Sequence, residues 1–182
     1  MAAYPHALIA YATAAGSTAE IAERIASMLR EAGAEAICTP VSPDVDAAGF
    51  DVLVVGSAVH YMAWLRPALD FLARAAETGT PIWCFSVGGL AHPYRGRLKR
   101  FMATSELQKV AQGFPAAFTP RDHRMFSGVV DMKGAPLWAR LFYRLTGSGP
   151  GDHRDWVDVV RWARAVADEM PRRGAGRHEQ VL

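Results

Sequence analysis

The segment that most constrains the fold lies near the N-terminus, over residues 7–20, which read ALIAYATAAGSTAE. Its first six residues are apolar or aromatic, as expected for a strand that helices cover on both faces. From Ile21 onward, apolar residues recur at helical spacing with charged residues between them. The segment therefore predicts a strand, a tight turn and a helix in direct succession.

The turn between this strand and this helix has the chemistry of a phosphate site. Thr13, Ser17 and Thr18 offer hydroxyl donors, and Gly16 lets the backbone approach an anion closely. The first amides of a helix lack partners within the helix and carry the positive end of its dipole, so they attract anions. The alternative is that Ser17 and Glu20 form a capping box and that nothing binds there. Because a capping box does not explain Thr13 or Gly16, we favour the phosphate site.

Further apolar runs follow at intervals that leave room for helices between them. Strands are expected over residues 7–12, 35–39, 51–56, 81–87 and 123–130. Helices are expected from residue 65 and over residues 98–111, 136–145 and 156–170, with Asp155 as an N-cap. This alternation predicts an α/β fold: a doubly wound, five-stranded parallel sheet with helices on both faces and a helical insert after the fifth strand. We expect one domain over residues 1–171 and a mobile tail over 172–182.

Charge and composition exclude several classes of function. The net charge of +2 is too weak to indicate nucleic-acid binding, and basic residues do not alternate with aromatic ones. We find no apolar run long enough to span a membrane and no secretory signal, so a cytoplasmic protein is expected. Cys38 and Cys84 form no C-x-x-C motif, which indicates neither a metal site nor a disulfide framework.

In a doubly wound sheet, ligands bind at the carboxyl ends of the strands. This rule brings the loops after residues 12, 57 and 87 to one edge. Aromatic residues in a loop often only pack on the core, but Tyr61 and Trp64 here lie beside a phosphate cradle and a glycine-rich loop. Together these loops suit a flat heteroaromatic ring with a phosphate tail, such as flavin mononucleotide (FMN). The expected contacts are Thr13, Ala14, Ala15, Gly16, Ser17, Thr18, Ala58, Val59, His60, Tyr61, Trp64, Ser86, Val87, Gly88 and Gly89.

These motifs resemble the flavodoxin superfamily. Residues 13–18, TAAGST, are similar to its T-x-T-G-x-T phosphate loop, with Ala15 in place of the middle hydroxyl. Val59-His60-Tyr61 and Trp64, and the segments 126–130, 137–145 and 151–156, resemble the branch that contains menaquinone-dependent protoporphyrinogen oxidase. The resemblance covers roughly residues 7–167. It implies a flavodoxin-like fold, an FMN cofactor, and electrons that pass from a reduced substrate, such as a porphyrinogen, through the flavin to a quinone. No side chain then has to act as a nucleophile.

Two basic segments are candidates for contacts outside the flavin site. The helical pattern over residues 136–145 has an apolar face and two arginines one turn apart. Such a helix is suited to contact with a membrane surface, a substrate, a second subunit or the domain's own core. The basic cluster over residues 95–100 is either a solvated helix start or a site for substrate carboxylates. The candidate substrate contacts are Arg95, Arg97, Trp138 and Arg140.

Two other functions stay open beside the flavin-dependent oxidoreductase. One is an electron-transfer flavodoxin with no substrate of its own, and the other is a flavodoxin-like binding module without flavin. The mildly basic charge places the carrier second, because carriers of that kind resemble one another in being acidic. A deazaflavin would suit the same pocket as FMN. The expected partners are a small-molecule reductant and a quinone or redox protein, with a peripheral contact to the inner face of the membrane and a homo-oligomer left open.

Overall fold

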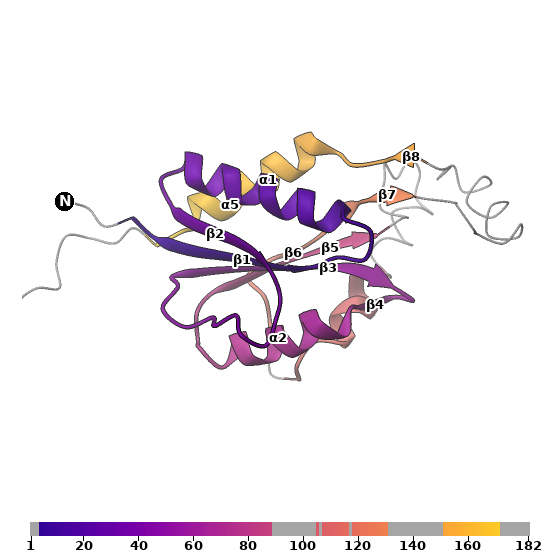
Figure 1. Cartoon of the computed structure of the whole chain (residues 1–182), viewed down its shortest axis with the longest axis horizontal. Coiled ribbons are helices and arrows are strands. Elements are labelled where there is room, and N and C mark those ends of the chain that lie inside the picture. Colours follow the sequence, from indigo (N-terminus) through magenta and orange to yellow (C-terminus); the bar gives the residue numbers. More distant parts are fainter. Residues whose placement is uncertain (1–3, 89–104, 106, 117, 131–150, 172–182) are drawn as a thin grey trace, which may run out of the picture.

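The computed structural model describes residues 4–88, 105, 107–116, 118–130 and 151–171 (Figure 1). Several sequence-based predictions lie outside these residues. They are the insert over residues 136–145, the tail over residues 172–182, and the predicted contacts Gly89, Arg95, Arg97, Trp138 and Arg140.

Five parallel strands form the centre of the fold. They are β1 (His6–Ala12), β2 (Glu35–Pro40), β3 (Val52–His60), β5 (Ile82–Gly88) and β6 (His123–Ser127). Their order is β2-β1-β3-β5-β6, and each neighbouring pair is parallel. The chain therefore winds outward in both directions from the boundary between β1 and β3. This confirms the predicted α/β fold with a doubly wound, five-stranded parallel sheet.

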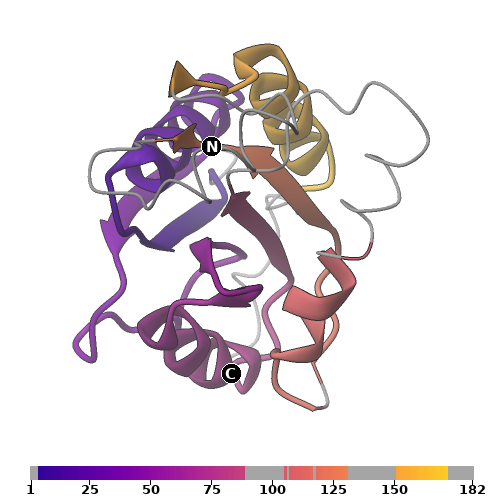
Figure 2. The ribbon, with the colours of Figure 1, turned by 90° about the vertical axis from the view of Figure 1, so that its right-hand side faces the viewer.

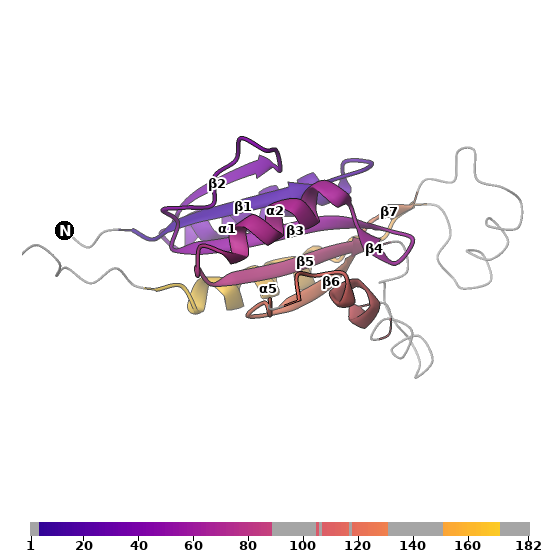
Figure 3. The same ribbon diagram turned by 90° about the horizontal axis from the view of Figure 1, so that it is seen from below.

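Helices cover both faces of this sheet, as predicted (Figures 1 and 2). Helices α1 (Ser17–Glu31) and α5 (Trp156–Asp168) lie on one face, and α2 (Arg66–Ala76) lies on the other (Figure 3). Alternate residues of each buried strand point to opposite faces. Ile9 thus packs in the cluster beneath α1 and α5, whereas Leu8 packs in the cluster beneath α2. The Asp155 side chain accepts a hydrogen bond from the Asp158 amide and caps α5, as its place in the sequence predicts.

The predicted loop over residues 57–64 is instead a β-hairpin. Strand β3 continues to His60, and β4 (Ala63–Trp64) pairs with it antiparallel. Tyr61 and Met62 form the two-residue turn with φ angles of 50° and 63°, as in the type I′ turns that suit hairpin twist. The prediction was wrong because such turns are recognised by glycine or asparagine, and neither residue is present here.

The predicted strand over residues 123–130 breaks at Gly128. Strand β6 ends at Ser127, and β7 (Val129–Val130) leaves the sheet to pair antiparallel with β8 (Gly151–Asp152). A Cβ atom at Gly128 would lie 3.0 Å from Val87 Cγ1 and 3.2 Å from Ser17 Oγ. The chain thus passes so close to β5 and the start of α1 that a side chain would crowd both.

Three further findings concern membranes, metals and thiols. No helix among the described residues is both long enough and apolar enough to cross a membrane. The same residues contain no group of three or more His, Cys, Asp or Glu side chains placed to hold a metal ion. Both cysteines are free thiols; Cys84 is buried, and burial raises the pKa of the partly exposed Cys38 to about 12.

Candidate functional site

The carboxyl ends of the parallel strands meet at one edge of the sheet, which faces the viewer in Figure 2. The strand register places Ala12 opposite Ser57, and Ser57 opposite Ser86. Further along, it places Gly88 opposite Ser127. Ligands of doubly wound sheets bind at this edge, where the strand order reverses. The structure thus brings the starts of the three predicted loops to one edge, and Gly128, which follows β6, lies there too.

Helix α1 begins at this edge without a side-chain cap. Its N-cap residue is Gly16, in a left-handed conformation with φ 94°, and the Gly16 amide donates to Thr13 Oγ1 at 2.9 Å. No hydrogen-bond acceptor for the amides of residues 17–19 is found in the described part of the chain. The capping-box alternative is wrong, because Ser17 is already helical and the Glu20 carboxylate pairs with Arg154 at 2.6 Å.

Thr18, in the first turn of α1, is fully buried, and its Oγ1 has no hydrogen-bond partner among the described residues. An unpaired buried hydroxyl costs about 1–3 kcal/mol, which a polar ligand atom would recover. Two residues earlier there is open space, because a Cβ atom added at Gly16 would meet nothing within 4 Å. Free amides, an unpaired hydroxyl and open space together fit an anion such as phosphate.

The β3–β4 hairpin presents an aromatic side chain at the same edge. Tyr61, at the hairpin tip, is 99% exposed, and its ring meets that of the exposed His60 edge-on, with 6.0 Å between centroids. Both residues at the tip carry positive φ angles, a conformation that costs a non-glycine residue about 1–2 kcal/mol. The hairpin thus holds the Tyr61 ring clear of the core, where a flat ligand can stack on it.

Trp64 lies in the core, although the sequence predicted it among the flavin contacts. It is 4% exposed and packs on Phe114, with 4.6 Å between ring centroids. Its Nε1–H donates to Ser86 Oγ at 2.7 Å, and Ser86 Oγ lies 2.8 Å from His123 Nε2. Burial lowers the pKa of His123 to about 4, so the imidazole is neutral at pH 7. These hydrogen bonds therefore anchor the hairpin, through Trp64, to Ser86 of β5 and His123 of β6.

A nearly buried arginine pairs with two exposed carboxylates beside the start of α1. The Arg154 side chain is 10% exposed and binds Glu20 of α1 and Asp152 of β8, each at 2.6 Å. Hydrogen bonds from Arg154 lower the pKa of Asp152 to about 2. The guanidinium also lies 4.7 Å from the centroid of the Trp156 ring. Arg154 thus ties β8 to the first turn of α1.

The remaining predicted contacts differ in what they can offer a ligand. Ala14 and Ala15 are exposed, and Ala58 and Val59 are partly exposed. Val87 is buried with its side chain in the core beneath α1 and α5, so only its backbone is available. Gly128 also lies at the site, although it is not among the contacts predicted from the sequence. An isolated glycine inside an apolar strand pattern is the signal that could have found it.

A family model described as a flavodoxin domain matches residues 8–155. The chain belongs to the flavodoxin-domain family. Among solved structures, flavodoxin 2 from Bacillus cereus has a TM-score of 0.54 at 20% identity, over 91% of this chain and 99% of that chain. A short-chain flavodoxin associated with a bacterial microcompartment scores 0.56 at 17% identity, over 90% and 97%. A flavodoxin from the domain Archaea scores 0.52 at 15% identity, over 90% and 97%. Among curated proteins, no match is found.

At these identities the solved structures show the fold alone. Membership of the flavodoxin-domain family indicates that the cofactor is FMN and that the flavodoxin domain transfers electrons. The matches do not support the narrower branch that contains protoporphyrinogen oxidase.

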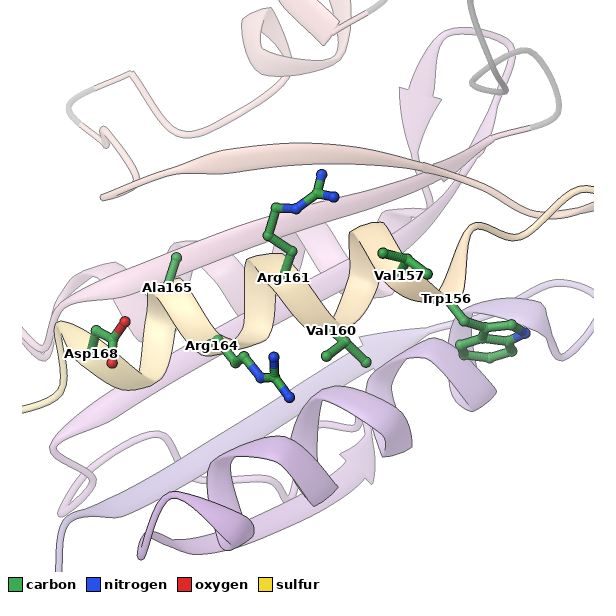
Figure 4. Close-up of a pocket in the computed structure, with 7 residues that line it drawn as sticks. All are labelled: Trp156, Val157, Val160, Arg161, Arg164, Ala165 and Asp168. Atoms are coloured by element: carbon green, nitrogen blue, oxygen red, sulfur yellow. The ribbon is translucent and has the colours of Figure 1, made fainter.

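The flavodoxin domain also has a surface hollow of about 610 Å³ along the outer side of α5 (Figure 4). In Figure 4, Arg161 and Arg164 extend from different sides of the helix. Helix α5 begins near the carboxyl edge of the sheet, at Trp156, and runs away from that edge. Polar groups do not converge in this hollow, so we do not assign the cofactor to it. Its lining residues are Trp156, Val157, Val160, Arg161, Arg164, Ala165 and Asp168.

Proposed function

We propose that the chain holds FMN with its phosphate at the start of α1 and its ring beside the β3–β4 hairpin. The observation that carries this placement is the uncapped start of α1, where free amides meet the unpaired Thr18 hydroxyl. A phosphate accepts hydrogen bonds from both kinds of donor. Bound FMN supplies the electron-transfer chemistry, and the chain supplies binding, orientation and electrostatics.

The ring end of the proposed site is formed by the hairpin and by the end of β5. Tyr61 offers an exposed aromatic face, and Ala58 and Val59 lead up to it. The backbone at Val87 and Gly88 supports the proposal because it adds little bulk beside a flat ring. The hydrogen bond that Trp64 donates to Ser86 and the hydrogen bond between Ser86 and His123 hold this hairpin in place under the ring.

The absorption spectrum of the purified protein tests flavin binding directly, and a pair of glycine variants tests the placement of the phosphate. Gly16 and Gly79 both have positive φ angles, 94° and 71°, and an added Cβ would meet no atom within 4 Å at either. Gly16→Ala and Gly79→Ala should therefore carry a similar strain of about 1–2 kcal/mol. Only Gly16 lies at the proposed cradle, because Gly79 follows α2 at the opposite edge of the sheet.

We expect the Gly16→Ala protein to lose FMN on gel filtration while the Gly79→Ala protein retains it. Urea unfolding should show a similar loss of stability in both variants, which separates ligand binding from folding. Equal FMN content in the two variants would contradict the proposed phosphate position. Reconstitution with a deazaflavin in place of FMN compares the two ring systems in the same site.

The proposal extends to a reduced substrate and a quinone, on the basis of the sequence resemblance. Its candidate substrate contacts, Arg95, Arg97, Trp138 and Arg140, lie outside the described residues. Anaerobic mixing of the flavin-loaded protein with protoporphyrinogen and a menaquinone analogue tests it. Flavin reduction followed by quinone reduction supports the oxidoreductase. Lack of reaction with the porphyrinogen favours the carrier flavodoxin, which converts no substrate of its own.

The proposed membrane contact has its own test. The arginines and apolar residues over 136–145 should bind vesicles that contain anionic lipid. Sedimentation with such vesicles measures this, and a protein that stays wholly in the supernatant would exclude the contact.

A further inference from the structure

Two buried hydroxyls of the flavodoxin domain have no hydrogen-bond partner among the described residues. They are Thr18 Oγ1, at the start of α1, and Ser127 Oγ, at the end of β6. Thr18 is 0% exposed and Ser127 is 4% exposed. Buried polar groups nearly always have a partner, because an unpaired group has lost its hydrogen bonds to water without replacement. Thr18 belongs to the proposed phosphate cradle, but Ser127 has no role in the fold that explains its unpaired hydroxyl.

Ser127 lies next to the proposed site. It directly precedes Gly128, where an added Cβ would lie 3.2 Å from Ser17 Oγ in the phosphate cradle. It also pairs with Gly88, at the end of β5. The end of β6 therefore borders both the phosphate cradle and the end of β5.

The direction of the Ser127 side chain follows from the alternation along β6. Phe126 packs in the cluster beneath α1 and α5, and Met125 packs against the cluster beneath α2. Ser127 therefore faces the α2 side of the sheet. This is also the side of Trp64, which anchors the hairpin that carries Tyr61.

We infer that the Ser127 hydroxyl hydrogen-bonds to the riboflavin part of FMN, an assignment that rests on the proposed function. The register places Ala58 opposite Val87, and the next residue of β5, Gly88, opposite Ser127, so a ring that extends from the hairpin across the end of β5 reaches the end of β6. A hydroxyl both donates and accepts, so the polar atoms of the ring or of the polyol chain satisfy it. Because Ser127 is buried, the ligand reaches it only when neighbouring side chains move aside. The two unpaired hydroxyls then bind different parts of the ligand: Thr18 binds the phosphate, and Ser127 binds the riboflavin part.

Binding of two probes, FMN and riboflavin, tests this division. Quenching of flavin fluorescence gives the Kd of each probe for the full chain and for the variants Ser127→Ala and Thr18→Val. We expect Ser127→Ala to raise both Kd values about tenfold and to leave their ratio unchanged. Thr18→Val should raise the Kd of FMN more than that of riboflavin, which has no phosphate. The urea midpoint of the Ser127→Ala apoprotein should be unchanged or higher, because the hydroxyl has no described protein partner.

Several outcomes would overturn the inference. Unchanged affinities in Ser127→Ala would remove Ser127 from the site, and a loss confined to FMN would make it a phosphate ligand instead. A lower urea midpoint for the Ser127→Ala apoprotein would show a structural role for the hydroxyl. If the wild-type chain binds neither probe, the proposed function fails, and the inference fails with it. Normal wild-type binding with an unaffected Ser127→Ala variant overturns the inference alone.

Discussion

His123 makes the stability of the flavodoxin domain depend on pH between about 6.5 and about 4. Burial lowers the pKa of its imidazole from 6.5 to about 4 in the folded state. The unfolded chain therefore takes up a proton at a higher pH than the folded chain, and acidification favours unfolding. The full stabilisation is present above about pH 6.5 and is lost as the pH falls toward about 4.

The magnitude follows from the size of this shift. Lowering the pKa from 6.5 to about 4, at about 1.4 kcal/mol per pH unit, corresponds to a total loss of about 3.5 kcal/mol. About 2 kcal/mol of it should be lost by a pH of about 5, since the unfolded state is then largely protonated at this position and the folded state is not. Carboxylates also titrate at the acid end of the range, so a variant is needed to isolate the histidine.

The variant His123→Gln removes the titrating group and keeps a side chain that can donate to or accept from the Ser86 hydroxyl. Urea unfolding of wild-type and variant apoproteins, followed by tryptophan fluorescence between about pH 7.5 and 4.5, gives the free energy of unfolding at each pH. When the pH falls from about 7.5 to about 5, the free energy of unfolding of the variant should drop by about 2 kcal/mol less than that of the wild type. His60→Gln, in the exposed part of the β3–β4 hairpin, controls for the loss of a histidine. Parallel curves for wild type and His123→Gln would refute the reasoning.

Three further substitutions test packing, backbone strain and a side-chain hydrogen bond, each by urea unfolding. Gly56→Ala should lower the free energy of unfolding by about 3 kcal/mol or more, because its Cβ would lie 2.0 Å from the Phe85 ring. Adding Phe85→Leu to the same chain should recover part of this loss. Met62→Gly should raise the free energy of unfolding by about 1 kcal/mol, because glycine adopts a φ of 63° without strain. A less stable variant would contradict the type I′ turn. Trp162→Phe should cost about 1–2 kcal/mol, because the indole N–H donates to Asp122 at 2.6 Å; an unchanged midpoint would exclude this bond as a contributor.

The sheet and its ligand-binding edge could be predicted because their signals are local. Strands of a parallel sheet are buried on both faces and are therefore apolar throughout, as residues 52–55 are. Gly16 and the hydroxyls around it mark the turn between a strand and a helix, and the structure places that turn at the carboxyl edge. A few consecutive residues suffice in both cases.

The hairpin at residues 57–64 could not be predicted in this way, because tertiary contacts hold it. Neither Tyr61 nor Met62 favours a positive φ, so their turn depends on anchors elsewhere. The Leu65 amide donates to Ser57 Oγ at 3.0 Å, and the Trp64 indole donates to Ser86. The pair between Arg154 and Glu20 likewise joins residues 134 positions apart, a separation at which no local pattern connects them.

Ser86 and Ser127 show why contacts in such a site cannot be assigned from residue type. Both are buried serines near the carboxyl ends of neighbouring strands, but only Ser86 is among the flavin contacts predicted from the sequence. Ser86 Oγ is occupied, with Trp64 on one side and His123 on the other, whereas Ser127 Oγ has no described partner. A hydroxyl that is already paired stabilises the scaffold and has little to gain from a ligand, whereas an unpaired one recovers its lost hydrogen bond on binding. Within the described residues, the polar groups that the fold leaves unpaired are therefore stronger candidates for ligand contacts than those that the sequence pattern alone selects.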